Sequence, residues 1–155
     1  MPKATPARRP ETKRQGDAAE IAFLQKANSQ GLRVSKPYGD SDRYDFIIDN
    51  GTHRLRIQVK SAGKQMGKDN YQIHSGRSLN RGNVAYRKSE IDFIAFYISP
   101  ENSWYIVPLK ALDGRLKVTL YSGNDPKNGA YGKYCEAWHL LKRARRESKH
   151  LCKKP

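Results

Sequence analysis

The sequence has few cysteines and no long apolar run, and each shortage excludes a class of protein. Its two cysteines, Cys135 and Cys152, form no C-x-x-C pair and have no nearby histidine at zinc-ligand spacing, so neither a disulfide scaffold nor a zinc site is expected. No stretch approaches the ~20 apolar residues that span a bilayer, and no apolar block follows the basic N-terminus as it would in a secretory signal. We therefore expect an intracellular protein without a signal peptide, and a chain of 155 residues has the length of one domain.

Acidic residues are also scarce relative to basic ones. The chain has 30 Lys and Arg against 15 Asp and Glu, a net charge of +15, of which +4 lies in residues 1–14 and +6 in residues 140–155. Basic ends of this kind displace counterions from a polyanion, which favours a nucleic-acid partner. The alternative is that the ends are solvated tails that only keep the protein soluble. A membrane surface is disfavoured, because no amphipathic segment pairs its lysines with a strong apolar face.

The pattern of apolar residues predicts one α/β domain at residues 15–141, between a disordered basic arm at 1–14 and a basic C-terminal helix or tail at 142–155. Residues 61–90 contain few aliphatic side chains and predict a long loop or an irregular ribbon. The other expected elements are a helix at 16–30 that stops at Gly31, strands at 32–36, 44–49, 52–60, 91–98, 104–107 and 115–121, a short helix at 108–113, and a helix at 134–151.

One carboxylate lies within the apolar stripe of the first helix. At about 100° per residue, Ala19, Phe23 and Ala27 share one face of the helix, and Glu20 lies in the middle of that face. A carboxylate on a buried face is costly unless a cation or a metal ion compensates its charge. The alternative is that Glu20 lies at the edge of the stripe and extends to solvent or pairs with an arginine.

The hairpin at 44–60 gathers a second set of polar side chains on one face. Asn50-Gly51 is a strong signal for a two-residue turn, which would place Asp45 opposite Arg56, with Gln58 diagonal to it and Lys60 beyond. In this register the aliphatic side chains of both strands share the other face, and a one-residue slip would expose them.

The polar face of this hairpin has the residue types that phosphodiester hydrolysis requires. A hard cation takes oxygen ligands, which Asp45, the amide oxygen of Gln58 and the Val59 carbonyl could supply. Lys60 would orient or deprotonate the attacking water, or stabilise the transition state. The alternative is a surface hairpin whose polar face is simply solvated.

Together, Glu20 on a helix, Asp45, and Gln58-Val59-Lys60 on the next strand resemble the core of the PD-(D/E)XK nucleases. The resemblance covers residues 14–141 and is closest to the small group I intron homing endonucleases of the cyanobacterial type, with archaeal Holliday junction resolvases as more distant relatives. The stretches that carry it are GDAAE at 16–20, KPYGD at 36–40, YDFIID at 44–49, RIQVKSA at 56–62, WYIVP at 104–108 and YCEAWHL at 134–140.

This resemblance implies a restriction-endonuclease-like fold, with a central mixed sheet flanked by helices in a single domain. It also implies Mg²⁺-dependent cleavage of double-stranded DNA, with Mn²⁺ as a substitute, by a homo-oligomer that is a dimer or a tetramer. The catalytic positions would be Glu20, Asp45, Gln58 and Lys60. Two departures from the motif stand out: Tyr44 replaces its proline, and Gln58 replaces its second acid and removes one negative charge from the metal site.

Basic, amide and aromatic side chains after the hairpin are expected to contact DNA, where Arg and amides suit base edges and Lys suits phosphates. The alternative is a mobile, solvated loop. The expected contacts are Lys64, Lys68, Tyr71, Arg77, Arg81, Arg87 and Lys88, together with Arg143, Arg145 and Arg146. The last three would contact only the sugar-phosphate backbone of the DNA.

The leading hypothesis is therefore a site-specific homing endonuclease. A structure-selective, junction-resolving nuclease would share the active site but prefer branched DNA. A third possibility is a basic DNA- or RNA-binding protein that retains the fold without catalysis.

Overall fold

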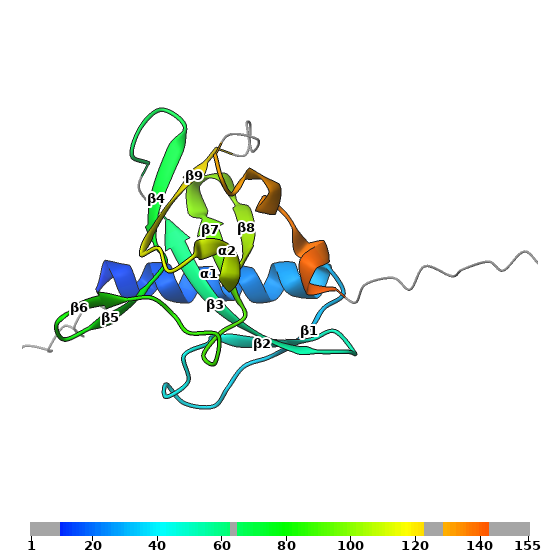
Figure 1. The fold of residues 1–155 in the computed structure, drawn as a ribbon. Coiled ribbons are helices and arrows are strands. Elements are labelled where there is room, and N and C mark those ends of the chain that lie inside the picture. Colours follow the sequence, from blue (N-terminus) through cyan, green and yellow to red (C-terminus); the bar gives the residue numbers. More distant parts are fainter. Residues whose placement is uncertain (1–9, 63–64, 123–128, 143–155) are drawn as a thin grey trace, which may run out of the picture.

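A five-stranded mixed sheet forms the centre of the molecule, in a computed structural model that describes residues 10–62, 65–122 and 129–142 (Figure 1). The strand order is β1-β2-β3-β7-β8, with β3 and β7 parallel and the other neighbours antiparallel. The predicted mixed sheet in an α/β fold is thus confirmed. These strands are β1 (Arg33–Ser35), β2 (Phe46–Asp49), β3 (Arg54–Ala62), β7 (Phe93–Ile98) and β8 (Ser103–Pro108).

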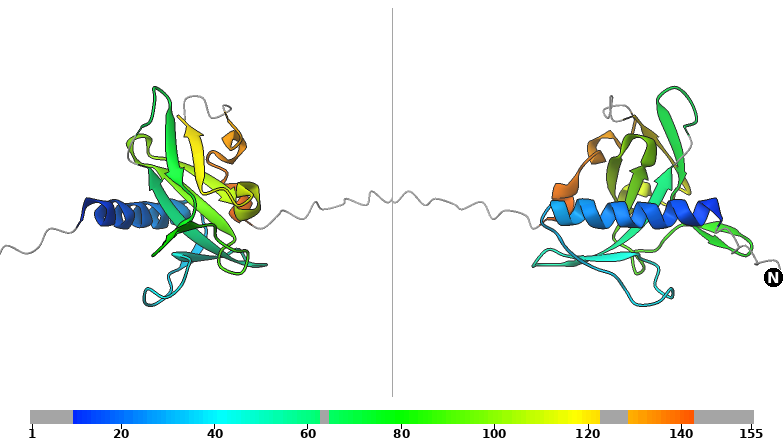
Figure 2. Two further views of the ribbon diagram at one scale, coloured as in Figure 1. Left: turned by 60° about the vertical axis from the view of Figure 1, so that its left-hand side comes forward. Right: turned by 180° about the vertical axis from the view of Figure 1, so that it is seen from behind.

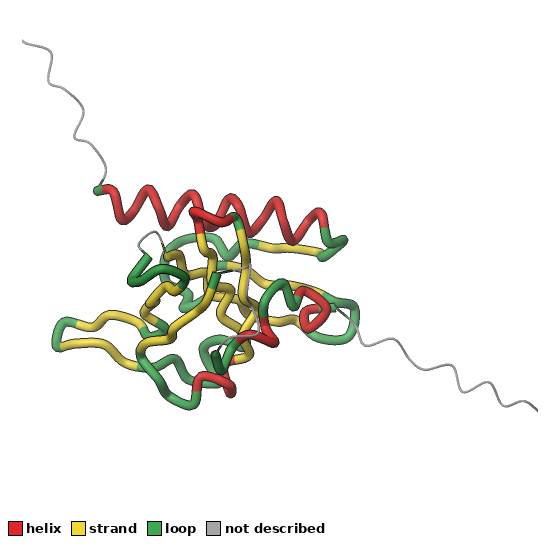
Figure 3. Tube along the Cα trace, turned by 90° about the horizontal axis from the view of Figure 1, so that it is seen from above, coloured by secondary structure: helices red, strands yellow, loops and turns green. Residues whose placement is uncertain are grey.

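Different elements cover the two faces of the sheet. Helix α1 (Glu11–Ser29) lies along one face, as Figures 2 and 3 show from two further directions. The other face is covered by a two-stranded antiparallel ribbon, β4 (Asn70–His74) with β9 (Lys117–Tyr121), and by the short helix α2 (Leu109–Leu112). A hairpin of β5 (Arg77–Leu79) and β6 (Gly82–Val84) projects from the body of the molecule (Figure 3).

The two faces of the sheet have separate hydrophobic cores. Beneath α1, the ring of Phe23 stacks on Phe46 with centroids 5.1 Å apart and meets Trp104 and Trp138 at 5.6 and 5.7 Å. On the other face, the ribbon and α2 bury their apolar side chains against β7 and β8. Every residue from Ile94 to Phe96 is fully buried, so β7 is covered on both faces by the two cores.

Helix α1 begins earlier than its apolar pattern predicts, at Glu11 instead of residue 16, so residues 11–14 are helical. It ends as predicted: Gly31 adopts a φ of +75°, and the Leu32 amide donates to the Ala27 carbonyl at 3.1 Å, which closes the last turn. No helix among the described residues is long and apolar enough to cross a membrane.

The turn between β2 and β3 differs from the predicted two-residue type, because residues 50–53 form a four-residue loop. The side chain of Asn50 accepts hydrogen bonds from the amides of Thr52 and His53, at 3.0 and 2.8 Å, and so stabilises the wider loop. The register therefore moves by two residues, and Phe46 pairs with Ile57. A shift of two preserves which side chains share a face, so the predicted faces are right and the predicted cross-strand pairs are wrong.

Residues 61–90 are more regular than predicted. Strand β3 continues to Ala62, and the segment then contributes β4, β5 and β6 instead of a long loop. The strand predicted at 115–121 becomes β9, which pairs with β4 and not with the central sheet.

The helix predicted at 134–151 is wrong over its described part. Two short 3₁₀ helices, η2 (Gly132–Tyr134) and η3 (Trp138–Leu141), replace it, and a third 3₁₀ helix, η1 (Ser99–Glu101), joins β7 to β8. Between η2 and η3, Glu136 has a φ of +49°, and its amide donates a hydrogen bond to the Trp104 carbonyl. Its side chain accepts hydrogen bonds from the Trp104 amide at 2.9 Å and from Trp138 Nε1 at 2.7 Å. These contacts with β8 are incompatible with a continuous helix. Residues 1–9, 63–64, 123–128 and 143–155 lie outside the described part of the chain.

Candidate active site

Asp45 is held just before β2 by hydrogen bonds to the middle of β3. Its amide donates to the Ile57 carbonyl at 2.8 Å, and its carboxylate Oδ2 accepts from Gln58 Nε2 and from the Val59 amide, both at 2.8 Å. The two-residue shift in register therefore brings Gln58 directly to Asp45. Arg56, which the sequence placed opposite Asp45, instead lies opposite Ile47 and pairs with Asp92 at 3.0 Å.

The electrostatic environment of Asp45 disfavours its negative charge. Burial is the main cause that raises the pKa of Asp45 to about 6; the charge of Glu20 acts in the same direction, while the Val59 amide and the ammonium groups of Lys60 and Lys36 act against it. A carboxylate with a raised pKa, in a cluster with a second acid, is typical of a site whose full charge is balanced only when a cation binds.

Lys60 lies two residues beyond Gln58 on the same face of β3. Burial lowers the pKa of the Lys60 ammonium, and the attraction of Asp45 partly offsets this effect. The ammonium lies 5.5 Å from the centroid of the Tyr86 ring. Burial, with the charges of Asp45 and Glu90, raises the pKa of Tyr86 to about 12, so this ring stays neutral beside the lysine.

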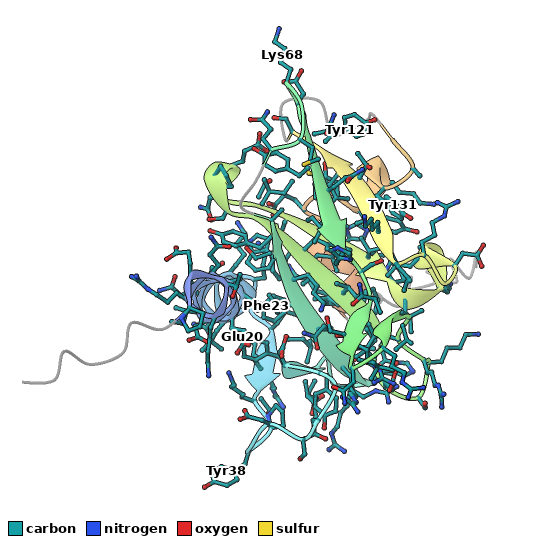
Figure 4. The ribbon with its side chains drawn as sticks, turned by 90° about the vertical axis from the view of Figure 1, so that its left-hand side faces the viewer. Glu20, Phe23, Tyr38, Lys68, Tyr121 and Tyr131 are labelled. Carbon is teal, nitrogen blue, oxygen red and sulfur yellow. The ribbon has the colours of Figure 1, made fainter. Side chains whose placement is uncertain are left out.

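Glu20 points from α1 toward the sheet, as its position beside Phe23 in Figure 4 shows. Its side chain is 26% exposed and forms an ion pair with Lys36, whose ammonium also lies 5.4 Å from the centroid of the Phe46 ring. The hydrogen bond to Glu20 raises the pKa of Lys36 despite some burial, and the charge of Asp45 contributes in the same direction. Glu20, Asp45 and Lys36 therefore form one electrostatic cluster.

The oxygen atoms of this cluster fit a hard divalent cation. The donors are the carboxylates of Glu20 and Asp45, the carbonyl of Val59 and the amide oxygen of Gln58. Gln58 now directs its amide nitrogen to Asp45 and to the Val59 carbonyl, the latter at 3.2 Å, so a half-turn of the amide would present its oxygen instead. Among the described residues, no group of three or more His, Cys, Asp or Glu side chains could hold a metal ion. A neutral ligand such as Gln58 would therefore have to complete the set.

Two side chains at the site were not among the predicted site residues: Lys36, which pairs with Glu20, and Tyr86, which lies against Lys60. Lys36 lies in the segment that joins α1 to the hairpin. Its position in the sequence, between the expected acids Glu20 and Asp45, was the only indication that it could belong to the site. Tyr86 reaches Lys60 from the segment after β6, and nothing in the local sequence indicates that contact.

The residues expected to bind DNA fall into three groups. Tyr71 requires a correction, because it is only 3% exposed and belongs to the core beneath the ribbon. The side chain of Arg77 is 17% exposed and lies 3.5 Å from Glu90, as an internal ion pair. Exposed side chains remain at Lys68, Arg81, Arg87 and Lys88, whereas Lys64, Arg143, Arg145 and Arg146 lie outside the described residues.

The raised pKa of Asp45 predicts that its charge destabilises the metal-free protein. Because the folded-state pKa of about 6 lies above the ordinary aspartate value of 3.8, the protonated form is the one that the fold favours. The stability that Asp45 contributes is thus present below pH ~4 and lost as the pH rises through 6, a loss of about 1–3 kcal/mol. Asp45→Asn, which stays neutral, should therefore melt several degrees above wild type at pH 7.5 in EDTA.

Thermal unfolding at several pH values checks this expectation. At pH 4.5 the difference between Asp45→Asn and wild type should shrink to about a third, and near pH 3.5 it should disappear. Asp49→Asn is the matched control, since it makes the same change at a strand end where the side chain is 35% exposed. If Asp45→Asn melted at or below the wild-type temperature at pH 7.5, Asp45 would not carry an unfavourable charge.

Comparison with known proteins places this geometry among nucleases. A family model described as PD-(D/E)XK endonuclease matches residues 10–141. The chain is similar to the solved structure of a bacterial homing endonuclease, I-Ssp6803I, with 30% identity, a TM-score of 0.72, and coverage of 85% of this chain and 93% of that one. It is also similar in fold to the Hjc Holliday junction resolvase of Archaeoglobus fulgidus, with 14% identity, a TM-score of 0.51, and coverage of 84% and 98%. Curated protein sequences give no match.

Proposed function

This chain belongs to the PD-(D/E)XK endonuclease family, and we propose that it is a site-specific homing endonuclease that hydrolyses double-stranded DNA with bound Mg²⁺. The observation that carries the proposal is Asp45, just before β2, beside Gln58 and Lys60 on one face of β3, with Glu20 approaching from α1. The similarity to a bacterial homing endonuclease at 30% identity supports site-specific cleavage over the other activities of the family.

The acids and the amide form the metal-binding part of the site. Asp45 and Glu20 supply the negative charge, and Gln58 and Val59 supply neutral oxygens. A divalent cation at this position would lower the pKa of a bound water and neutralise charge on the scissile phosphate. The hydrogen bond from the Val59 amide fixes the Asp45 carboxylate in place, so little reorganisation is needed when a cation binds.

Lys60 would supply positive charge to the reacting phosphate. Its ammonium can donate to the attacking water or to a phosphate oxygen, and it stabilises negative charge that grows in the transition state. The lowered pKa of Lys60 also brings the neutral amine closer to physiological pH, where it can accept a proton from water.

Incubation of plasmid DNA with different divalent ions tests the proposed function. Cleavage is expected with Mg²⁺ or Mn²⁺ and not with EDTA, whereas Ca²⁺ should support DNA binding without turnover, because Ca²⁺ tolerates looser geometry and activates water poorly. Undiminished cleavage in EDTA would contradict the metal mechanism. A panel of linear duplexes and four-way junctions then separates the two nuclease activities: faster cutting of junctions would favour the resolving activity over homing.

The exposed basic side chains should make DNA binding strongly dependent on salt. Arg81 lies at the tip of the β5–β6 hairpin, and Lys68 lies at the far end of the molecule before β4 (Figure 4). If each contacts one phosphate, Arg81→Ala and Lys68→Ala should each reduce the slope of log affinity against log salt by ~0.9. Binding of a labelled duplex in Ca²⁺ at several salt concentrations measures this slope, and slopes equal to wild type would remove both residues from the interface.

We also propose that the protein acts as a homo-oligomer, a dimer or a tetramer. Each chain has one cluster around Asp45, and cutting both strands of a duplex at one site requires two such clusters. Sedimentation equilibrium in the presence of target DNA would measure the number of chains.

A further inference from the structure

The ribbon of β4 and β9 has one buried face and one polar face. Its buried face carries Tyr71, Ile73, Val118 and Leu120, each at most 5% exposed, and anchors the ribbon on the sheet. Because side chains alternate along a strand, the residues between them point outward. At the centre and at one end of the ribbon, the outward residues are Gln72, paired with Thr119, and His74, paired with Lys117.

These four side chains carry hydrogen-bonding groups and no negative charge. Gln72, His74 and Lys117 are exposed, Thr119 is half-buried, and neither strand contains an acidic residue. A surface that binds another protein usually has apolar anchors at its centre, whereas the centre of this face is the polar pair Gln72 and Thr119; the exposed apolar side chain of Met66 lies beside it, before β4. Its composition instead suits the donor and acceptor groups on base edges.

The polar face of the ribbon adjoins the candidate active site. Gln72, His74 and Lys117 line the same cavity as Lys60, a hollow of about 370 Å³ between the end of β3 and the ribbon. A DNA strand whose phosphate is bound at Lys60 would therefore pass directly beside the ribbon. The left-hand view of Figure 2 shows β4 and β9 on the side of the sheet away from α1.

We propose that the β4–β9 ribbon enters the major groove next to the cut and reads base edges through Gln72 and His74, while Lys117 binds a guanine edge or an adjacent phosphate. This proposal rests on the proposed function. The major groove is ~12 Å wide and admits a two-stranded ribbon, whereas the undistorted minor groove is only ~6 Å wide. Gln pairs well with the adenine edge, and Lys pairs with guanine O6 and N7. The buried face fixes the ribbon as one rigid unit, so the readers keep a constant distance from Lys60.

Selection of cleaved sites from a randomised DNA library tests whether the ribbon contacts base edges. In Gln72→Ala and His74→Ala, the base preference at one or two neighbouring positions beside the cut should weaken about 5- to 100-fold, and preferences elsewhere should stay the same. Gln25→Ala is the matched control, because Gln25 is exposed on α1, on the opposite face of the sheet. Preference profiles of both ribbon variants identical to wild type would overturn the inference.

Binding without cleavage provides a second, independent measurement. In Ca²⁺, wild type should bind the selected duplex more tightly than duplexes substituted at the affected positions, and Gln72→Ala should lose that difference while keeping its affinity for the substituted duplexes. Affinity lost equally for all duplexes would reduce the ribbon to a phosphate contact and overturn base reading. If wild type cut no DNA with Mg²⁺ or Mn²⁺, the proposed function would fail; if it cut DNA and the ribbon variants kept its preferences, only this inference would fail.

Discussion

Lys60→Met is expected to slow DNA cleavage by at least ~10²–10³-fold while DNA affinity in Ca²⁺ changes little. Removing one preorganised charge or donor from a developing transition state costs about this much in other enzymes. Methionine keeps an unbranched side chain of similar size, so the packing around the half-buried Lys60 and against Tyr86 should survive. The loss should therefore appear in the chemical step and not in binding.

Single-turnover cleavage with protein in excess over DNA measures that step directly. Lys110→Met is the matched control, since Lys110 is exposed on α2 and has no part in the Asp45 cluster. We expect the control to cut at the wild-type rate. If Lys60→Met cut within a fewfold of wild type, Lys60 would not be a catalytic residue and the assignment of the site would be wrong.

The faces of the catalytic hairpin could be predicted because they depend only on the alternation of side chains along a strand. Phe46 and Ile57 share the core face and Asp45 and Gln58 share the other face in any register that differs by two. The pairing itself could not be predicted from Asn50-Gly51, since the Asn50 side chain stabilises a wider loop through its hydrogen bonds. The predicted site residues therefore come together more closely than expected.

Contacts between distant segments account for what the sequence did not reveal. Glu136 has its conformation because it binds Trp104 and Trp138, and no local pattern around residue 136 contains that information. The same applies to Tyr86, which reaches Lys60 from the far side of the β5–β6 hairpin. The β4–β9 ribbon pairs segments more than 40 residues apart, so it could not be recognised before the fold was known.

Glu20→Gln is expected to lower Mg²⁺ affinity at least about tenfold, which corresponds to ~1.4 kcal/mol, and to slow cleavage strongly at low Mg²⁺. Because Gln58 is neutral, Glu20 and Asp45 are the two carboxylates that can hold the cation, and this substitution removes half of their charge. The melting temperature of the metal-free protein should change little, since the partner of Glu20, Lys36, is 60% exposed and exposed ion pairs contribute little stability.

Lys36→Met separates this role from a purely structural one. The Lys36 ammonium donates a hydrogen bond to Glu20, and the negative charge of Asp45 also raises the pKa of Lys36. Lys36 therefore neutralises the same two carboxylates that a metal ion would use. If Glu20 binds the metal, removing this internal cation should increase Mg²⁺ affinity, and the two variants should shift the Mg²⁺ dependence in opposite directions. If Glu20 serves only the ion pair, both variants should leave the Mg²⁺ dependence unchanged, and any small loss of melting temperature should be the same in both.

Titration of cleavage rate and of melting temperature against Mg²⁺ distinguishes these outcomes for each variant. Glu11→Gln provides the control, because it makes the same change on α1 at a side chain that is 69% exposed. The melting temperature reports Mg²⁺ binding in the absence of DNA. The cleavage rate alone would not, because Lys36 is 60% exposed and its loss could weaken a contact with a DNA phosphate without any effect on the metal ion. Superimposable Mg²⁺ curves for wild type, Glu11→Gln and Glu20→Gln would leave Asp45 as the single charged ligand. A hard dication held by one carboxylate and neutral oxygens would then have to draw its remaining charge balance from the DNA phosphate itself.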